Sequence, residues 1–584
     1  MPRLFCRVRT NRRYVGKRPT ALPLYFAVTY LSLTRMLIPR RTNSSELALL
    51  SLLCVLASCA TPDAGRRTEG ATSAEAFVAE ARQAKDPATQ IGLALAAADS
   101  AARNLSVGDA RLTYNAACVE LAARVGKSTG GVSLPATFST PSGAYRLEFN
   151  MDRPSGAWGS SFFAELLPTD EIKNKHLISA APLSGYGGAL VGVSLPPNAR
   201  ELLLPRVGVS APVTAVVNFS RPARSGDPIR AILTLYDPAK RNSALVAGEK
   251  RPLAADLTAP FGYYPNPGDL GILGMLSPEK FLEKEGFFLV QPYDRDKTPI
   301  VFVHGLMSVP QMWIPVMAAI ESDPALRGKF QFWVFAYPTG NPIAYSALKL
   351  RQALESVYKV YPGTRNMVII NHSLGGDLTH LQVIDSGDVL VKGIFKENAP
   401  KIMALPPSSL VKQALIFKAN PRIKRVVFVA APHRGAPLAV NFIGRIGAAL
   451  IHLPGRLISQ IGTTTIEEAA AAGGLGKNFV PNSINALSPK NPLLISMNEV
   501  PIRAPFHSII GVAGSPKSPL EKTSDTVVPY WSSHLDAALS EKIVPYPHTA
   551  MFVKPEATDE IKRILHLHLK TVGVPKPALA KTTP

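Results

Sequence analysis

The sequence predicts an α/β fold for the C-terminal half of the chain, with a mostly parallel sheet, preceded by a small helical segment and a β-rich domain. Three changes of pattern along the 584 residues predict this order. Residues 71–125 are Ala-rich with a helical period, and residues 131–240 alternate polar and apolar residues between Pro and Gly. From about residue 290, apolar runs alternate with helical patterns. With 46% hydrophobic residues, the chain can build more than one core.

Much of the positive charge is concentrated at the N-terminus. The formal net charge is +22, and residues 1–41 hold ten Lys or Arg and no acidic residue. The remaining charges are scattered in both signs, with no basic patch interleaved with aromatic residues. We therefore expect no nucleic-acid partner.

The segment 36–58 has the pattern of a secretory signal peptide. It begins "MLIPRRTNSSELALLSLLCVLAS", with two arginines, a short apolar run and a small-residue junction. The apolar run is too short to cross a bilayer as an ordinary helix. Residues 1–35 lie upstream of this module and are interpreted as a doubtful N-terminal extension that starts at a mis-called initiation codon.

Cys59 directly follows Leu-Ala-Ser and resembles the acylated cysteine of the bacterial lipobox. The resemblance implies that Cys59 becomes the first mature residue and attaches the chain to a membrane through its lipid. Ala60 at the next position favours the outer membrane of the cell envelope, facing the periplasm. The alternative is a buried cysteine in a generic signal core. One other cysteine, Cys118, would then remain, which allows no internal disulfide.

The β-rich part reads as a small antiparallel sandwich or barrel, because short alternating runs are separated by turn residues. No residues in it have the spacing of metal ligands. In the C-terminal half, "PIVFVHG", "NMVIINHS" and "IKRVVFVAAPHRG" read as buried parallel strands, and chemistry gathers at the carboxyl ends of such strands.

Ser373 stands where one of these strands ends and a helical pattern begins, in "NHSLGG". A nucleophilic serine on a strained strand-to-helix turn needs small residues two positions before and after it. Gly375 meets this need, and Asn371 replaces the usual first glycine. The alternative is an ordinary turn serine.

Three further motifs share the order of a known family. His304-Gly305-Leu306 follows an early strand, Asp525 lies in "KTSDTVVPYWSSHL", and His548 closes "EKIVPYPH". Together with Ser373, these motifs resemble the serine esterases and lipases of the α/β-hydrolase fold, particularly the bacterial lipase-like enzymes.

The resemblance implies a catalytic triad in which His548 takes a proton from Ser373 and Asp525 orients the imidazole. It implies an oxyanion hole formed by the backbone N–H groups of Leu306 and Leu374. The expected substrate is an acyl ester or a lipid, cleaved through an acyl-enzyme, with no metal and no organic cofactor. His304 is expected to brace its loop rather than transfer a proton.

Several other residues compete for these roles or suggest other functions. The rival bases and acids are His372, His433, His507, His534, Asp377, Asp385 and Asp388. Two apolar stretches, about 385–420 and 437–500, predict either a mobile lid or a fixed cap. An acyltransferase and a non-catalytic scaffold lipoprotein remain as alternative functions.

The predicted domains follow from these patterns. They are an extension (1–35), a signal peptide (36–58), an Ala-rich helical segment (59–130), a β-rich domain (131–285), an α/β-hydrolase domain with helical cap or lid insertions (286–571) and a disordered tail (572–584).

Overall fold

The computed structural model describes residues 73–125, 133–152, 163–172, 182–195, 208–264, 285–437, 487–514 and 519–572. These residues all belong to one compact unit, residues 70–584. The predicted extension, the signal peptide, Cys59, most of the second lid stretch and the tail beyond Val572 lie outside the described residues. Among the described residues, no helix combines the length and the apolar character needed to cross a membrane.

The helical segment contains three helices, α3 (Ser73–Gln83), α4 (Pro87–Ala102) and α5 (Ala110–Val125). Helix α4 starts where the sequence indicates, because Asp86 caps it by accepting a hydrogen bond from the Thr89 N–H at 2.8 Å and Pro87 opens its first turn.

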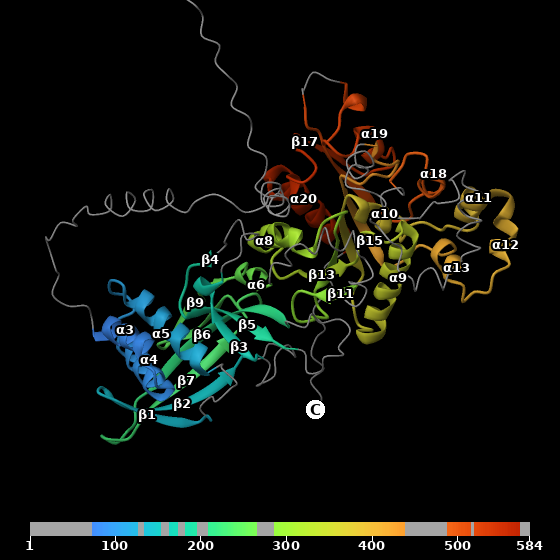
Figure 1. Ribbon diagram of the computed structural model, residues 1–584. Helices are drawn as coiled ribbons and strands as arrows, with labels where there is room; N and C mark the ends of the chain where they lie inside the picture. Colours follow the sequence, from blue (N-terminus) through green and yellow to red (C-terminus); the bar gives the residue numbers. More distant parts are fainter. Residues whose placement is uncertain are drawn as a thin grey trace, which may run out of the picture. The chain divides into compact units, whose positions relative to one another are not determined.

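The β-rich part is a single six-stranded sheet in the order β1-β2-β7-β6-β5-β3 (Figure 1). Its strands are β1 (Ala136–Thr140), β2 (Gly143–Met151), β3 (Glu165–Pro168), β5 (Gly188–Ser194), β6 (Val209–Ser220) and β7 (Ile229–Tyr236). Strands β2 and β7 run parallel, whereas the other neighbours are antiparallel. The expectation of a purely antiparallel sandwich or barrel was therefore wrong. After β2 the chain crosses to the far edge at β3 and returns as a meander, so that β7 arrives beside β2 in the same direction.

Helices and sheet share one core in this part of the chain. Leu95 of α4 and Leu121 of α5 belong to the same buried cluster as Leu147, Val213 and Leu233 of the sheet. The helices thus supply the apolar cover that a second sheet would give in a sandwich.

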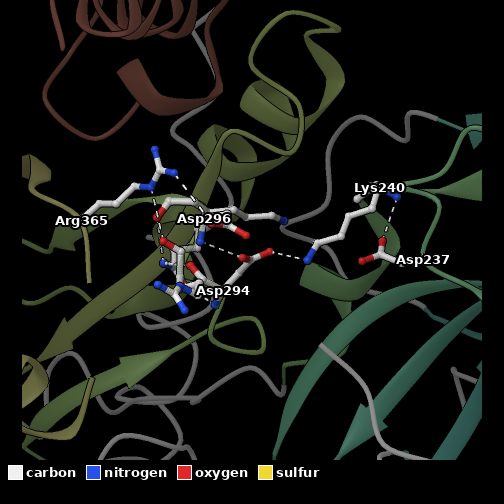
Figure 2. A network of polar contacts seen from close by, with 9 residues as sticks. Asp237, Lys240, Asp294, Asp296 and Arg365 are labelled. Atoms are coloured by element: carbon white, nitrogen blue, oxygen red, sulfur yellow. Dashed lines mark hydrogen bonds and ion pairs between the residues drawn. The ribbon is translucent and has the colours of Figure 1, made fainter. Parts of the chain in front are cut away.

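Shorter elements complete the β-rich part. They are the pair β4 (Pro182–Leu183) and β10 (Ala255–Asp256), the hairpin β8 (Ser243–Val246) and β9 (Glu249–Pro252), and helix α6 (Ala259–Gly262). The ring of Phe261 in α6 meets Phe332 of the C-terminal sheet edge to face, with centroids 5.5 Å apart. Figure 2 shows a second connection, in which the Lys240 ammonium pairs with the Asp294 carboxylate at 2.8 Å.

The C-terminal half is built on a seven-stranded sheet in the order β11-β13-β12-β14-β15-β16-β17. The strands are β11 (Gly286–Leu289), β12 (Thr298–Val303), β13 (Phe330–Ala336), β14 (Met367–His372), β15 (Ile423–Val429), β16 (Phe506–Gly511) and β17 (Glu541–Val544). Only the edge strand β11 runs antiparallel to its neighbour among these strands. The predicted α/β class with a mostly parallel sheet is confirmed.

Helices cover both faces of this sheet (Figure 1). The main helices are α8 (Ile314–Ser322), α9 (Ile343–Val360), α10 (Leu374–His380) and α20 (Pro555–Val572). In β12, Val301 and Val303 join the core beneath α9 and α10, whereas Ile300 and Phe302 join the core beneath α8 and α20. Because successive strand residues point to opposite faces, a continuous apolar run is what a two-sided cover requires.

The first lid stretch forms three short helices, α11 (Val389–Phe395), α12 (Ala399–Met403) and α13 (Leu410–Leu415), which α18 (Pro492–Asn498) contacts. Its two ends are fastened together. The Ser386 N–H donates to the Phe417 carbonyl at 3.1 Å, the Phe417 N–H donates to the Ser386 hydroxyl at 2.8 Å, and the Ala419 N–H donates to the Asp385 carboxylate at 3.0 Å. The stretch therefore leaves and re-enters the domain at a hydrogen-bonded base.

Candidate active site

Ser373 occupies a strained turn between β14 and α10. Its φ of 53° and ψ of −131° lie in a region that non-glycine residues rarely adopt. The neighbours must be small, because a Cβ at Gly375 would lie 2.6 Å from the carbonyl oxygens of Val303 and His304. Asn371, which stands where the motif usually has glycine, is completely buried in β14 and is accommodated there.

Asp525 and His548 form a buried hydrogen-bonded pair. The His548 Nδ1 donates to Asp525 Oδ2 at 2.6 Å, and the His548 N–H donates to the Asp525 carbonyl at 2.7 Å. The other carboxylate oxygen accepts the N–H groups of Val527 and Val528 at 2.9 and 2.7 Å. Since Nδ1 carries the proton, Nε2 of His548 is left free to accept one.

The turn at Ser373 lies beside this pair. His372, the preceding residue, packs its ring against the His548 ring with centroids 4.5 Å apart. Within the described residues the Ser373 hydroxyl makes no hydrogen bond to His548. In enzymes without substrate such bonds are often long and tighten when substrate binds. The three predicted residues thus stand at adjacent strand ends, with the acid and the base already joined.

The predicted oxyanion loop follows β12 and reaches the same place. A Cβ on Gly305 would lie 2.8 Å from the Ser373 Cβ, so only glycine allows the loop to approach this closely. Met307 then adopts a φ of 56°. In the part of the chain that the structure describes, the N–H groups of Leu306 and Leu374 have no hydrogen-bond acceptor.

His304 braces this loop. Its Nδ1 donates to the Gly305 carbonyl at 3.1 Å, and its Nε2 accepts the Tyr337 N–H at 3.4 Å. The Tyr337 hydroxyl donates to the His304 carbonyl at 2.8 Å. Burial lowers the pKa of His304 to about 4, so the ring stays neutral near neutral pH. These contacts agree with the structural role expected for it.

The rival bases have other partners. His507 accepts a hydrogen bond from Arg425 at 2.6 Å inside β16, and burial lowers its pKa to about 4. His433 shares a proton with His380, their Nδ1 atoms being 3.2 Å apart. His534 lies between Glu541 at 2.6 Å and Asp536 at 3.0 Å.

The rival acids also differ from Asp525. Asp385 pairs with Arg503 at 3.0 Å and Asp388 pairs with Lys392 at 2.6 Å, both at the surface. Asp377 is completely buried on α10, and neither carboxylate oxygen has a hydrogen-bond partner. Burial raises its pKa well above the ordinary value.

Sequence reasoning missed the isolation of Asp377 and the contact of His372 with His548. For Asp377 a signal was present, because the acid interrupts the pattern Leu374, Leu378, Leu381 on the helix that follows the serine. For His372 no local signal exists, since its contact with His548 joins residues far apart in sequence.

The described residues contain no group of His, Cys, Asp or Glu side chains arranged to hold a metal ion. Glu285, by contrast, shows what burial alone does to an acid outside the site: it raises the pKa of this carboxyl to about 7.

The sheet order, the strained serine after β14, the acid after β16 and the histidine after β17 decide the fold of this half. It is the α/β-hydrolase fold. No protein-family model matches the chain, and no curated protein sequence matches it.

Solved structures are similar to the α/β-hydrolase half. The mature lipase BlEst2 of Bacillus licheniformis is 16% identical, with 48% of this chain and 97% of that chain covered and a TM-score of 0.29. Lipase 1 of Pelosinus fermentans is 13% identical, with 47% and 98% covered and a TM-score of 0.30. EstA of Clostridium botulinum is 12% identical, with 46% and 86% covered and a TM-score of 0.29. The assignment of the fold depends on the strand order and the turn at Ser373, not on these likenesses.

Proposed function

We propose that the protein is a serine hydrolase that cleaves carboxylic esters. The observation that carries the proposal is the buried Asp525–His548 pair beside the strained turn of Ser373. A carboxylate held by two backbone N–H groups and bonded to a histidine has a fixed direction, and this histidine presents its free nitrogen toward the strand ends. That is the arrangement a serine needs in order to lose its proton.

The reaction proceeds in two steps. Ser373 Oγ attacks the ester carbonyl carbon while its proton passes to His548 Nε2, and the N–H groups of Leu306 and Leu374 receive the negative oxygen. The C–O bond to the alcohol breaks, and the alcohol leaves with the proton from His548. Water then attacks the acyl-enzyme, gives its proton to His548, and releases the acid together with the restored serine.

Asp525 supports the positive imidazole that forms in each step. Its carboxylate is almost completely buried, where an ion pair is screened little by water. His304 and His372 are neutral, so they do not oppose the charge on His548.

A fluorophosphonate probe tests this proposal directly. We expect the folded wild-type protein to be labelled covalently and Ser373→Ala to lose the label. Ser508→Ala is the matched control, because Ser508 is also a buried serine, in the strand β16. Folded wild-type protein that takes no label would contradict the proposal and would favour the scaffold alternative.

A series of p-nitrophenyl esters defines the acyl group. Release of nitrophenol without a new ester, in the presence of added alcohol, supports hydrolysis. Formation of a new ester from the added alcohol would instead support an acyltransferase, since that alcohol then replaces water in the second step.

Attachment to the outer membrane through an acylated Cys59 is a further part of the proposal and is supported by the sequence motif alone. Metabolic labelling with a fatty acid analogue tests it. We expect Cys59→Ala to lose the label and to leave the membrane fraction, and an unlabelled wild-type protein would contradict the anchor.

A further inference from the structure

His372 contacts both the nucleophile's turn and the base, although its sequence position suggests only a neighbour of Ser373. Its Nε2 lies 3.2 Å from the backbone carbonyl oxygen of His548. A carbonyl oxygen can only accept a hydrogen bond, so Nε2 must carry the proton of the ring. Nδ1 then holds the lone pair, and it is buried without a hydrogen-bond partner among the described residues.

The ring of His372 is also fixed by packing. It is 4% exposed and meets the edge of Phe552, with centroids 4.6 Å apart. On another side, a Cβ on Gly305 would lie 2.9 Å from His372 Nδ1, which shows how closely the oxyanion loop covers it. The ring therefore stands between the loop that would hold the oxyanion and the imidazole of His548.

The backbone of His548 is consequently held on both sides. Its N–H donates to the Asp525 carbonyl at 2.7 Å, and its carbonyl accepts from His372 at 3.2 Å. The first bond ties the base to the acid. The second ties it to the residue that precedes the nucleophile.

We infer that His372 is a positioning residue, which holds the loop of His548 against the turn of Ser373 through its Nε2–H and its ring. This inference rests on the proposed function. The bond matters because the Ser373 hydroxyl has no hydrogen bond to His548 in the described structure, so the distance between the two depends on how their backbones are joined. A displacement of about 1 Å between reacting groups can lower a rate by about 100-fold.

The ring must be neutral for this role. Burial lowers the pKa of His372 well below its ordinary value, and the nearby His548 lowers it further. A neutral ring donates at Nε2 and adds no positive charge beside His548, which becomes an imidazolium during the reaction.

Two substitutions separate the hydrogen bond from the packing. His372→Phe keeps a ring and removes the donor, whereas His372→Gln keeps an N–H donor at a similar reach and removes the ring. With a p-nitrophenyl ester, we expect His372→Phe to lower kcat by about 10- to 100-fold with KM changed by less than about twofold. We expect His372→Gln to recover most of that loss.

His568→Phe is the matched control. His568 is also a buried histidine, 1% exposed, but it lies on α20 with its ring 6.5 Å from Phe330. We expect its kcat to stay near the wild-type value. A purely structural effect of losing a buried histidine would lower the melting temperature in both Phe variants without the selective loss of kcat.

The tautomer supplies a measurement that does not depend on the variants folding. In protein labelled with ¹⁵N-histidine, we expect the His372 signal, assigned by its absence from His372→Gln or His372→Phe, to be that of a neutral ring protonated at Nε2. A ring protonated at Nδ1, or a cation at neutral pH, would overturn the inference.

Failure of the inference is distinguishable from failure of the proposed function. A folded His372→Phe with wild-type kcat would overturn the positioning role, while fluorophosphonate labelling that is lost in Ser373→Ala would leave the esterase proposal standing. Wild-type protein with neither labelling nor ester cleavage would overturn both.

Discussion

Asp99 in the helical and β-rich part and Asp377 in the α/β-hydrolase part are both buried, yet their surroundings are opposite. Asp99 is 2% exposed and accepts hydrogen bonds from Arg103 at 2.7 Å, Arg221 at 2.6 Å and Tyr145 at 3.0 Å. Asp377 is 0% exposed and has no hydrogen-bond partner. One part of the molecule satisfies its buried charge, whereas the other leaves a carboxyl unsatisfied four residues after the nucleophile.

The difference extends to the backbone and to other side chains. In the hydrolase part, Asn371 and His372 of β14 also bury polar atoms without partners, and Ser373 is strained. Such exceptions are uncommon in folded proteins and gather at functional sites. The comparison teaches that the strand ends around Ser373 are arranged for a reaction, and that the N-terminal part is arranged for stability.

The largest expected effect concerns the strained turns. Ser373→Gly should abolish ester cleavage, by about 10⁴-fold or more, because the nucleophile is lost. It should also raise the free energy of unfolding by about 1 kcal/mol, since glycine adopts the positive φ without strain. Kinetics and denaturant unfolding measure the two effects.

Ala247→Gly is the matched variant in the N-terminal part, because Ala247 has a φ of 51° in the turn between β8 and β9. It should relieve a similar strain with no change in kcat. A loss of activity in Ala247→Gly would break the comparison.

A second test replaces the satisfied aspartate. Asp99→Asn should lower the free energy of unfolding by about 2 kcal/mol, because three donors lose a charged acceptor. Arg103 and Arg221 are half exposed and regain water, which limits the cost. The kcat should not change. Chemical denaturation with urea measures this, and an unchanged stability would show that the bonds of Asp99 contribute nothing net.

The opposite sign is expected for the unsatisfied aspartate. Asp377→Asn should raise the free energy of unfolding at neutral pH by about 1 kcal/mol, because an amide carries no charge to bury. The pKa of Asp377 is raised in the folded state, so wild-type stability is full below the ordinary value of 3.8 and falls as the pH rises above it. The advantage of the variant should therefore grow above pH 4. An advantage independent of pH would contradict this account.

The smallest expected effect concerns His534, whose hydrogen bond to Glu541 raises its pKa. A raised histidine pKa gives stability that is present below the ordinary value of 6.5 and is lost as the pH rises through the folded value. His534→Gln should remove this loss. Because the side chain is 35% exposed, we expect less than about 0.5 kcal/mol. Melting temperatures between pH 5 and 8, as a range of about three units around the histidine pKa, measure it.

The strands and helices of the hydrolase part could be predicted because their patterns are local. Continuous apolar runs such as Thr298–Val303 and Met367–His372 indicate strands covered on both faces, and the helical period of Ile343–Val360 is regular. The positions of Ser373, Asp525 and His548 at strand ends follow from the same runs. Their joint catalytic role remains a prediction.

The architecture of the β-rich part could not be predicted from the same kind of evidence. Alternation identifies a strand with one buried face and does not say what covers that face. Here helices α4 and α5 cover it, and the parallel pairing of β2 with β7 depends on where the chain crosses the sheet.

By itself, the sequence determined the order of the elements, the residues at the ends of the buried strands and the small residues that the turn at Ser373 requires, because each depends on neighbours along the chain. Only the tertiary structure decided that His548 pairs with Asp525, that the ring of His372 meets His548, and that Asp99 finds donors whereas Asp377 finds none. The physical reason is that hydrogen bonds and burial depend on residues brought together from distant strands, and local periodicity carries no information about which of them meet.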